Sequence, residues 1–197
     1  PPLQRDDLFS DGALRGSAWC RAHTQRVDAW IASVWDHVTG TANGGAPLTG
    51  AALVATGGHG RAELCPMSDL DLLLVVRSHA DTEEVASKLW YPIWDAGLKL
   101  GHSVRTVDEA LDLAKDDLDT ATSLLTTRCI AGDEQLAATL AERALDQWRS
   151  ASKRTIAELA ERVEQRHARH GEVAFLLEPD IKEGRGGLRD VHALSWL

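Results

Sequence analysis

Two acidic side chains, Asp69 and Asp71, have the type and spacing best suited to chemistry in this chain. They open the run Leu70 to Val76, whose apolar residues on both faces predict a buried central strand. Residues two apart on a strand point to the same face, so the two carboxylates should lie side by side. Unpaired, they would repel each other and lose hydration, whereas Mg²⁺ prefers such hard oxygen ligands. The pair therefore predicts a divalent-cation site. The alternative is a turn cap at Asp69 with a solvated Asp71.

A glycine pair, Gly57-Gly58, precedes these acids and follows an expected strand over 51–56. Glycine lets the backbone approach a phosphate closely, and free N–H groups at a helix start attract anions. Ser68 is a candidate to add a hydroxyl contact to the nucleotide. No GK[ST] follows, and the glycine spacing does not fit GxGxxG, so neither of those nucleotide loops is predicted. A plain tight turn is the alternative for the glycines alone, but with Asp-x-Asp they predict a phosphate and metal site.

The elements that must hold these residues form an α+β pattern. Helical spacing of apolar residues covers 11–38, a loop 39–49, and strands are expected over 51–56, 70–76 and 101–107. A helix over 81–96 should start with Asp81 or Thr82 as N-cap. After residue 108 the pattern is helical, near 108–115, 117–127, 133–149, 152–170 and from 188. We predict three segments: N-terminal helix and loop (1–48), core with a small mixed sheet (49–115), and helical region with a glycine-rich loop (116–197).

Bulk properties exclude several classes of function. The 197 residues carry a formal net charge of −9, which argues against broad binding of nucleic acid but allows a local basic pocket for a phosphorylated ligand. Three isolated cysteines without CxxC spacing predict a reducing, cytoplasmic setting and no disulfide framework. No apolar run predicts a membrane span, and the start has no signal-peptide layout. Both ends look cut, so we expect a fragment of a longer protein.

The glycine pair, spacer and Asp-x-Asp together resemble the nucleotidyltransferase superfamily that includes DNA polymerase β. Longer stretches resemble the N-terminal region of the bacterial uridylyltransferase/uridylyl-removing enzymes, which modify the PII nitrogen-signalling protein. These stretches are GGHGRAELCPMSDLDLLLV, WDAGLKLGHSVRTVDEA, TSLLTTRCIAGD and LEPDIKEGRGGLRDVHAL. The resemblance covers about Ala51 to Leu197, and the last two stretches also resemble the adenylyltransferase of glutamine synthetase.

The resemblance implies a Mg²⁺-dependent enzyme, with Mn²⁺ able to substitute, that transfers UMP from UTP to a PII tyrosine. Asp69 and Asp71 would be the catalytic metal ligands, and Gly57-Gly58 the triphosphate turn. The tyrosine oxygen would attack the α-phosphorus in line, helped by positioning and charge stabilisation. Transfer of AMP from ATP is an open alternative, as is an adenylyltransferase of the glutamine synthetase type. A non-catalytic, nucleotide-binding regulatory module of the same fold is the third.

A third metal-binding acid is expected on a neighbouring strand in this superfamily. The corresponding strand, His102 to Arg105, contains none. Asp180 is therefore the candidate for a third metal ligand beside Asp69 and Asp71. Its alternative role is that of a helix-entry or loop residue.

Basic residues supply the remaining nucleotide-binding candidates, Arg61, Arg105 and Lys182. Each could contact phosphate. For Arg61 the alternative is an ion pair with Glu63, and for Arg105 an ion pair with a nearby acid. Lys182 belongs to a basic, glycine-rich loop that would either close over the nucleotide or clasp the helical region to the core.

Overall fold

The computed structural model describes residues 6–44, 48–79 and 83–197. The chain begins with α1 (Asp6–Ser10), α2 (Ser17–Thr39) and the 3₁₀ turn η1 (Thr41–Asn43). The helix predicted over 11–38 is thus present as α2, with a later start. Its buried residues include Val27, Ile31 and Trp35, four apart, which make one apolar face. Gly40 ends α2 in the left-handed conformation that glycine adopts without strain.

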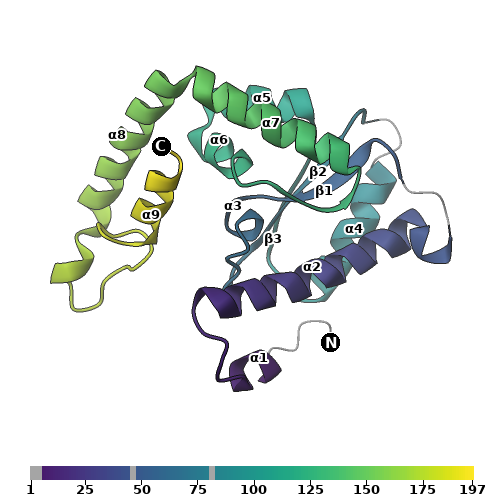
Figure 1. Cartoon of the computed structure of the whole chain (residues 1–197), viewed down its shortest axis with the longest axis horizontal. Coiled ribbons are helices and arrows are strands. Elements are labelled where there is room, and N and C mark those ends of the chain that lie inside the picture. The colour runs from purple at the N-terminus through teal and green to yellow at the C-terminus, as the bar shows by residue number, and fades with distance from the viewer. Residues whose placement is uncertain (1–5, 45–47, 80–82) are drawn as a thin grey trace.

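A mixed sheet lies at the centre (Figure 1). Its strands are β1 (Ala51–Ala55), β2 (Leu70–Val76), β3 (Leu100–Thr106) and β4 (Arg128–Gly132), in the order β3-β2-β1-β4. Strand β2 runs antiparallel to β1 and parallel to β3. The three predicted strands are confirmed, with β2 internal and apolar on both faces.

The fourth strand lies between the helices predicted over 117–127 and 133–149, in residues to which the sequence assigned no element. Strand β4 is five residues long and pairs with β1 through a register shift between Leu53 and Val54. Such a short segment carries no readable alternation, so its pairing depends on the strand beside it. At Gly132 a Cβ would lie 2.4 Å from the Ala51 carbonyl oxygen, so the close approach to β1 requires glycine. The sheet therefore extends beyond residue 115, the predicted limit of the core.

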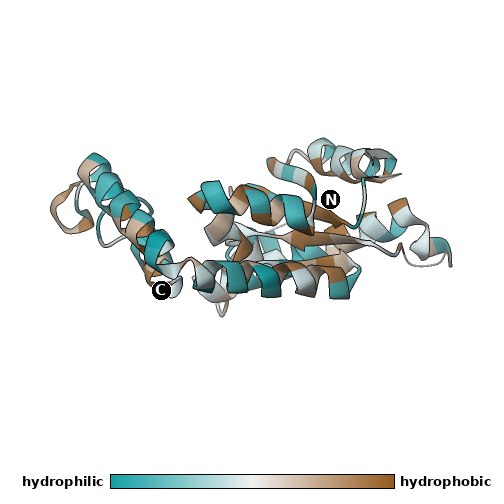
Figure 2. Cartoon of the chain, turned by 90° about the horizontal axis from the view of Figure 1, so that it is seen from above, coloured by the Kyte–Doolittle hydropathy of each residue, from teal (hydrophilic) through white to brown (hydrophobic). Residues whose placement is uncertain are grey.

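Helices cover both faces of the sheet, as Figure 2 shows by the brown strands between helical layers. Helices α2 and α4 (Glu83–Asp95) pack on one face. The other face is covered by α5 (Val107–Asp116), α6 (Leu118–Leu124) and α7 (Glu134–Ser150). The N-cap predicted at Asp81 or Thr82 lies outside the described residues.

The C-terminal part is a helical arm that leaves the sheet along α8 (Figure 1). It comprises α8 (Ser152–His170), the 3₁₀ turn η2 (Val173–Phe175) and α9 (Leu188–Ser195), which confirms the helices predicted over 152–170 and from 188. A separate apolar cluster of Leu118, Trp148, Leu159 and Ala193 joins this arm to α6 and α7. The predicted α+β class, with a helix before the sheet and a helical region after it, is confirmed. None of the described helices is long and apolar enough to cross a membrane.

Candidate functional site

Asp71, the second residue of β2, lies between two glycines. A Cβ at Gly57 would stand 3.3 Å from Asp71 Oδ2, and one at Gly101 would stand 3.0 Å from Asp71 Oδ1. Gly101 is the register partner of Asp71 on β3, and Gly57 has a φ of 56°, which favours glycine. The missing side chains leave both flanks of the carboxylate open.

The two acids predicted as metal ligands are close, but they differ in exposure. Asp69 lies just before β2 with its side chain 60% exposed, 3.9 Å from Lys99 Nζ. Burial raises the pKa of the Asp71 carboxyl above its ordinary value, and the negative charge of Asp69 raises it further. Positive charges oppose this rise at three residues, His59, Lys182 and Arg61. Asp71 is thus a half-buried carboxylate that a cation would stabilise.

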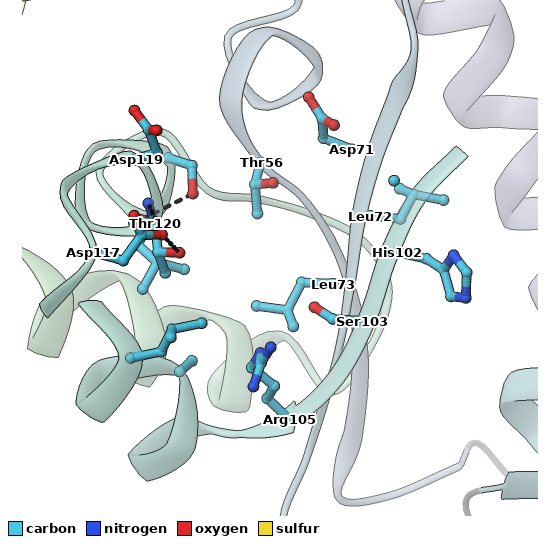
Figure 3. A pocket seen from close by; sticks show the side chains of 15 residues that line it. Thr56, Asp71, Leu72, Leu73, His102, Ser103, Arg105, Asp117, Asp119 and Thr120 are labelled. Carbon is cyan, nitrogen blue, oxygen red and sulfur yellow. Dashed lines mark hydrogen bonds between the residues drawn. The ribbon is translucent and has the colours of Figure 1, made fainter. Parts of the chain in front are cut away.

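A cavity of about 340 Å³ opens beside Asp71 (Figure 3). The sheet contributes Asp71, Ser103 and Arg105 to its wall, and the start of α6 contributes the N-cap residue Asp117 and Thr120. Arg105 forms no ion pair or hydrogen bond within the described part of the chain, so the guanidinium is available to an anionic ligand. The cavity therefore combines the carboxylates of Asp71, Asp117 and Asp119 with Arg105, a basic group that no described residue pairs with.

The glycine turn forms the short helix α3 (Gly57–Gly60). Two of the residues predicted to contact nucleotide after it, Arg61 and Ser68, form hydrogen bonds with residues nearby in the sequence. Arg61 Nε donates to Glu63 Oε2 at 2.7 Å, the ion pair that was its alternative reading. Ser68 Oγ accepts the Cys65 N–H at 2.9 Å and so holds a turn. Gly58 faces Arg61, since a Cβ there would lie 3.8 Å from Arg61 Nη2. The turn, through Gly57, and the charge of Arg61 are thus both close to Asp71.

Asp180 is not brought to the acid pair. Its Oδ1 accepts the backbone N–H groups of Lys182 and Glu183, and its Oδ2 lies 3.6 Å from His170 Nδ1. Among the described residues, no three acidic, histidine or cysteine side chains are grouped to hold a metal. Asp180 instead caps its own loop, which is the alternative role predicted for it. That it binds a metal stays a prediction. Lys182 lies close enough to Asp71 for its charge to lower the pKa of that carboxyl.

Other residues around the site were missed from the sequence. The sequence does not mark Gly101 as a site residue, because its position beside Asp71 depends on the parallel pairing of β2 with β3. Asp117 gives no signal of a cavity wall, since its pattern is that of an N-cap, and it does accept the Thr120 N–H. Three further residues, Asp28, His59 and Arg128, hold the glycine turn through hydrogen bonds.

The donor set fits a hard divalent cation. Asp71 and Asp69 offer carboxylate oxygens, and the Asp71 carboxylate accepts no hydrogen bond from the described residues. A small number of carboxylates, completed by phosphate oxygens and water, is the usual protein environment of Mg²⁺. The open cavity leaves room for those remaining ligands.

Sequence comparisons find similarity to the bifunctional uridylyltransferases/uridylyl-removing enzymes. Residues 154–197 match the family described as GlnD PII-uridylyltransferase. A bifunctional uridylyltransferase/uridylyl-removing enzyme of Streptomyces coelicolor is 43% identical over 197 residues, covering 96% of this chain and 23% of the relative. Relatives of the same description in Mycobacterium tuberculosis and Rhodopseudomonas palustris are 45% and 46% identical, over 86% and 74% of this chain and 21% and 16% of their own lengths. The chain thus spans less than a quarter of these relatives.

The comparison with solved structures gives a more distant similarity. A structure described as a toxin–antitoxin with AMP-PNP has a TM-score of 0.39 and 8% sequence identity to this chain. It covers 64% of this chain and 96% of its own. A similarity at this level is too low to define a shared fold.

Proposed function

The chain is homologous to the N-terminal region of the bifunctional uridylyltransferase/uridylyl-removing enzymes, and on this basis we propose that it catalyses nucleotidyl transfer at Asp71 and Asp69. One observation carries the proposal. The Asp71 carboxylate lies beside an open cavity, flanked by two glycines and accompanied by Asp69. A carboxylate that is half-buried without a hydrogen-bond partner is costly unless a cation joins it.

Asp71 and Asp69 would hold Mg²⁺, which supplies charge neutralisation for a triphosphate and its leaving group. Gly57 and Gly101 keep the flanks of Asp71 free of side chains, so phosphate oxygens can reach the site. Arg105 faces the same cavity and would bind a phosphate oxygen, with Lys182 adding positive charge from the C-terminal arm. These groups position the α-phosphorus for attack by an incoming hydroxyl, and their contribution is orientation and charge.

We propose UTP as the nucleotide and a tyrosine of PII as the acceptor, because the relatives are described as uridylyltransferases and the matching family as PII-uridylyltransferase. ATP is the alternative donor.

The test incubates the chain with PII, Mg²⁺ and either UTP or ATP, and weighs PII by mass spectrometry. The proposal predicts a gain of one nucleotidyl group, with UTP preferred. A gain in the mass of PII with ATP alone would show that the donor is ATP and not UTP. If folded protein gives no gain with either nucleotide, the enzymatic proposal is wrong for this chain.

A non-catalytic nucleotide-binding module is the second candidate. It is favoured by one observation, namely that no third acid joins Asp69 and Asp71 among the described residues. Such a module would bind Mn²⁺ and a nucleoside triphosphate together, yet would leave the mass of PII unchanged. Binding and transfer measured on the same preparation therefore separate the two candidates.

A further inference from the structure

The short helix α3 cannot hold its own shape. It has four residues, three of them glycine, and glycine loses the most conformational freedom on ordering. Isolated helices of this length are not stable in water. The conformation of Gly57 to Gly60 must therefore be imposed by neighbouring elements.

Arg128 of β4 makes the contacts that impose it. Its Nη2 donates to the His59 carbonyl oxygen at 3.0 Å, and its Nε donates to the Gly60 carbonyl oxygen at 3.3 Å. Its Nη1 donates to Asp28 Oδ2 at 2.7 Å. One planar guanidinium thus joins two carbonyls of the turn to a carboxylate of α2, a geometry that lysine cannot reproduce.

Asp28 of α2 completes the arrangement by joining Arg128 to His59. Its Oδ1 lies 2.9 Å from His59 Nε2, and the His59 side chain is fully buried. The Asp28 side chain is 17% exposed and that of Arg128 34%. Burying such groups is seldom the most stabilising use of a position, since apolar residues of similar volume often do as well. Their presence here is better explained by a defined position of α3 than by stability.

The far end of the turn adjoins the acid of the site. A Cβ at Gly57 would meet Asp71 Oδ2 at 3.3 Å, whereas one at Gly60 would stand 1.8 Å from the Thr126 carbonyl oxygen. Thr126 Oγ1 also donates to the Gly57 carbonyl oxygen at 3.3 Å. The turn is therefore packed between Asp71 and the segment that leads into β4. We expect a displacement of Gly60 to displace Gly57 as well, because only two residues separate them.

We propose that Arg128, Asp28 and His59 form a clamp of positioning residues that sets the glycine turn at its working distance from Asp71. The clamp rests on the proposed function for its purpose but not for its structural effect. None of the three residues lines the cavity beside Asp71, and Arg128 acts on the turn through the backbone carbonyls of α3.

The structural test is hydrogen–deuterium exchange of the whole chain. Arg128→Lys keeps the positive charge but loses the fork, and Asp28→Asn keeps the size but loses the charge. Each should speed the amide exchange of residues 56–63, while α7 stays protected. The backbone hydrogen bonds of this segment include those from Gly60 N–H to the Thr56 carbonyl oxygen and from Glu63 N–H to the Gly58 carbonyl oxygen. Arg143→Lys is the matched control, because the ion pair of Arg143 among the described residues is with the exposed Asp108. Unchanged exchange at 56–63, or loosening of the whole fold in either variant, would overturn the clamp.

The functional test is the rate of nucleotide transfer to PII. Both clamp variants should lower kcat at saturating nucleotide by on the order of tenfold or more, because small misplacements at a reacting centre are costly. The control should keep the wild-type kcat. Faster exchange with an unchanged kcat would refute the positioning role. If wild type itself transfers nothing, the proposed function fails, and the exchange experiment still decides whether the clamp exists.

Discussion

The space around the Asp71 carboxylate stays open because the residues on its two sides have no side chain. Gly57 and Gly101 flank its carboxylate, so a methyl group on either side would displace an oxygen that the proposed cation needs. Asp69 is more exposed and is paired only loosely, with Lys99. The two acids are therefore unequal, with Asp71 at the centre of the site and Asp69 at its rim.

Gly101→Ala tests this confinement. Its Cβ would stand 3.0 Å from Asp71 Oδ1, so we expect kcat/KM for transfer to fall by on the order of tenfold or more. The free energy of unfolding should change by no more than about 1 kcal/mol, since alanine is favoured over glycine within a strand. Gly12→Ala is the control, because nothing lies within 4 Å of the added Cβ. Transfer kinetics and urea unfolding measure both effects, and full activity in Gly101→Ala would argue against the geometry.

Asp71→Asn tests the cost of the carboxylate. Burial and the charge of Asp69 raise the pKa of Asp71, so its ionised form destabilises the metal-free fold at neutral pH. In chelator the variant should melt above wild type, with each 1 kcal/mol relieved raising Tm by roughly 2–4 °C. With Mg²⁺ and UTP the order should reverse, because only wild type gains ligand stabilisation. A variant less stable than wild type in chelator would contradict this.

At the scale of elements, the sequence predicts the strand that holds Asp71 and most of the helices around the sheet. Strand β2 is readable because its apolar run is long and buried on both faces, and α7 and α8 because their periodicity is long. Strand β4 was missed because five residues including Arg128 and Gly132 show no period, and its formation depends on β1. The cavity could not be predicted either, since Arg105 and Asp117 come to line the same space only through the packing of α6 against the sheet.

The N-cap of α6 provides a test of that cavity wall. Asp117 Oδ2 accepts the Thr120 N–H at 3.0 Å. Asp117→Ala should lower the free energy of unfolding by about 1 kcal/mol, whereas Asp117→Asn should retain most of it because asparagine caps equally well. Urea unfolding measures the difference. Equal stability of the two variants would show that the cap does not hold α6 in place.

At the scale of the whole molecule, the C-terminal arm reaches back to the loop after the glycine turn. His192 Nε2 of α9 lies 3.2 Å from Glu63 Oε2, the oxygen that also accepts from Arg61. Trp148 Nε1 donates to the Trp196 carbonyl oxygen and ties α7 to the end of α9. These contacts add to the apolar cluster that docks the arm on α6 and α7, and the arm brings the charge of Lys182 to Asp71.

His192→Gln tests this docking through pH. Burial lowers the pKa of His192 below its ordinary value of 6.5, with Arg61 adding to the fall, so the folded state favours the neutral ring. Stability should be full above pH 6.5 and decline as pH drops below it, because the unfolded chain takes up the proton first. His192→Gln should flatten the decline in Tm between about pH 7.5 and 5.5, around the ordinary histidine pKa. The exposed His37→Gln is the control, and a decline identical in all three proteins would exclude His192 as its source.

The acid pair is the centre of the proposed activity, so its removal is the most direct test. Wild type and an Asp69→Ala, Asp71→Ala double variant, each shown to be folded, are incubated with PII, Mg²⁺ and UTP or ATP, and PII is weighed by mass spectrometry. The proposal predicts a nucleotidyl group on PII with wild type and none with the double variant. Transfer that persists in the double variant would contradict the assignment of Asp69 and Asp71.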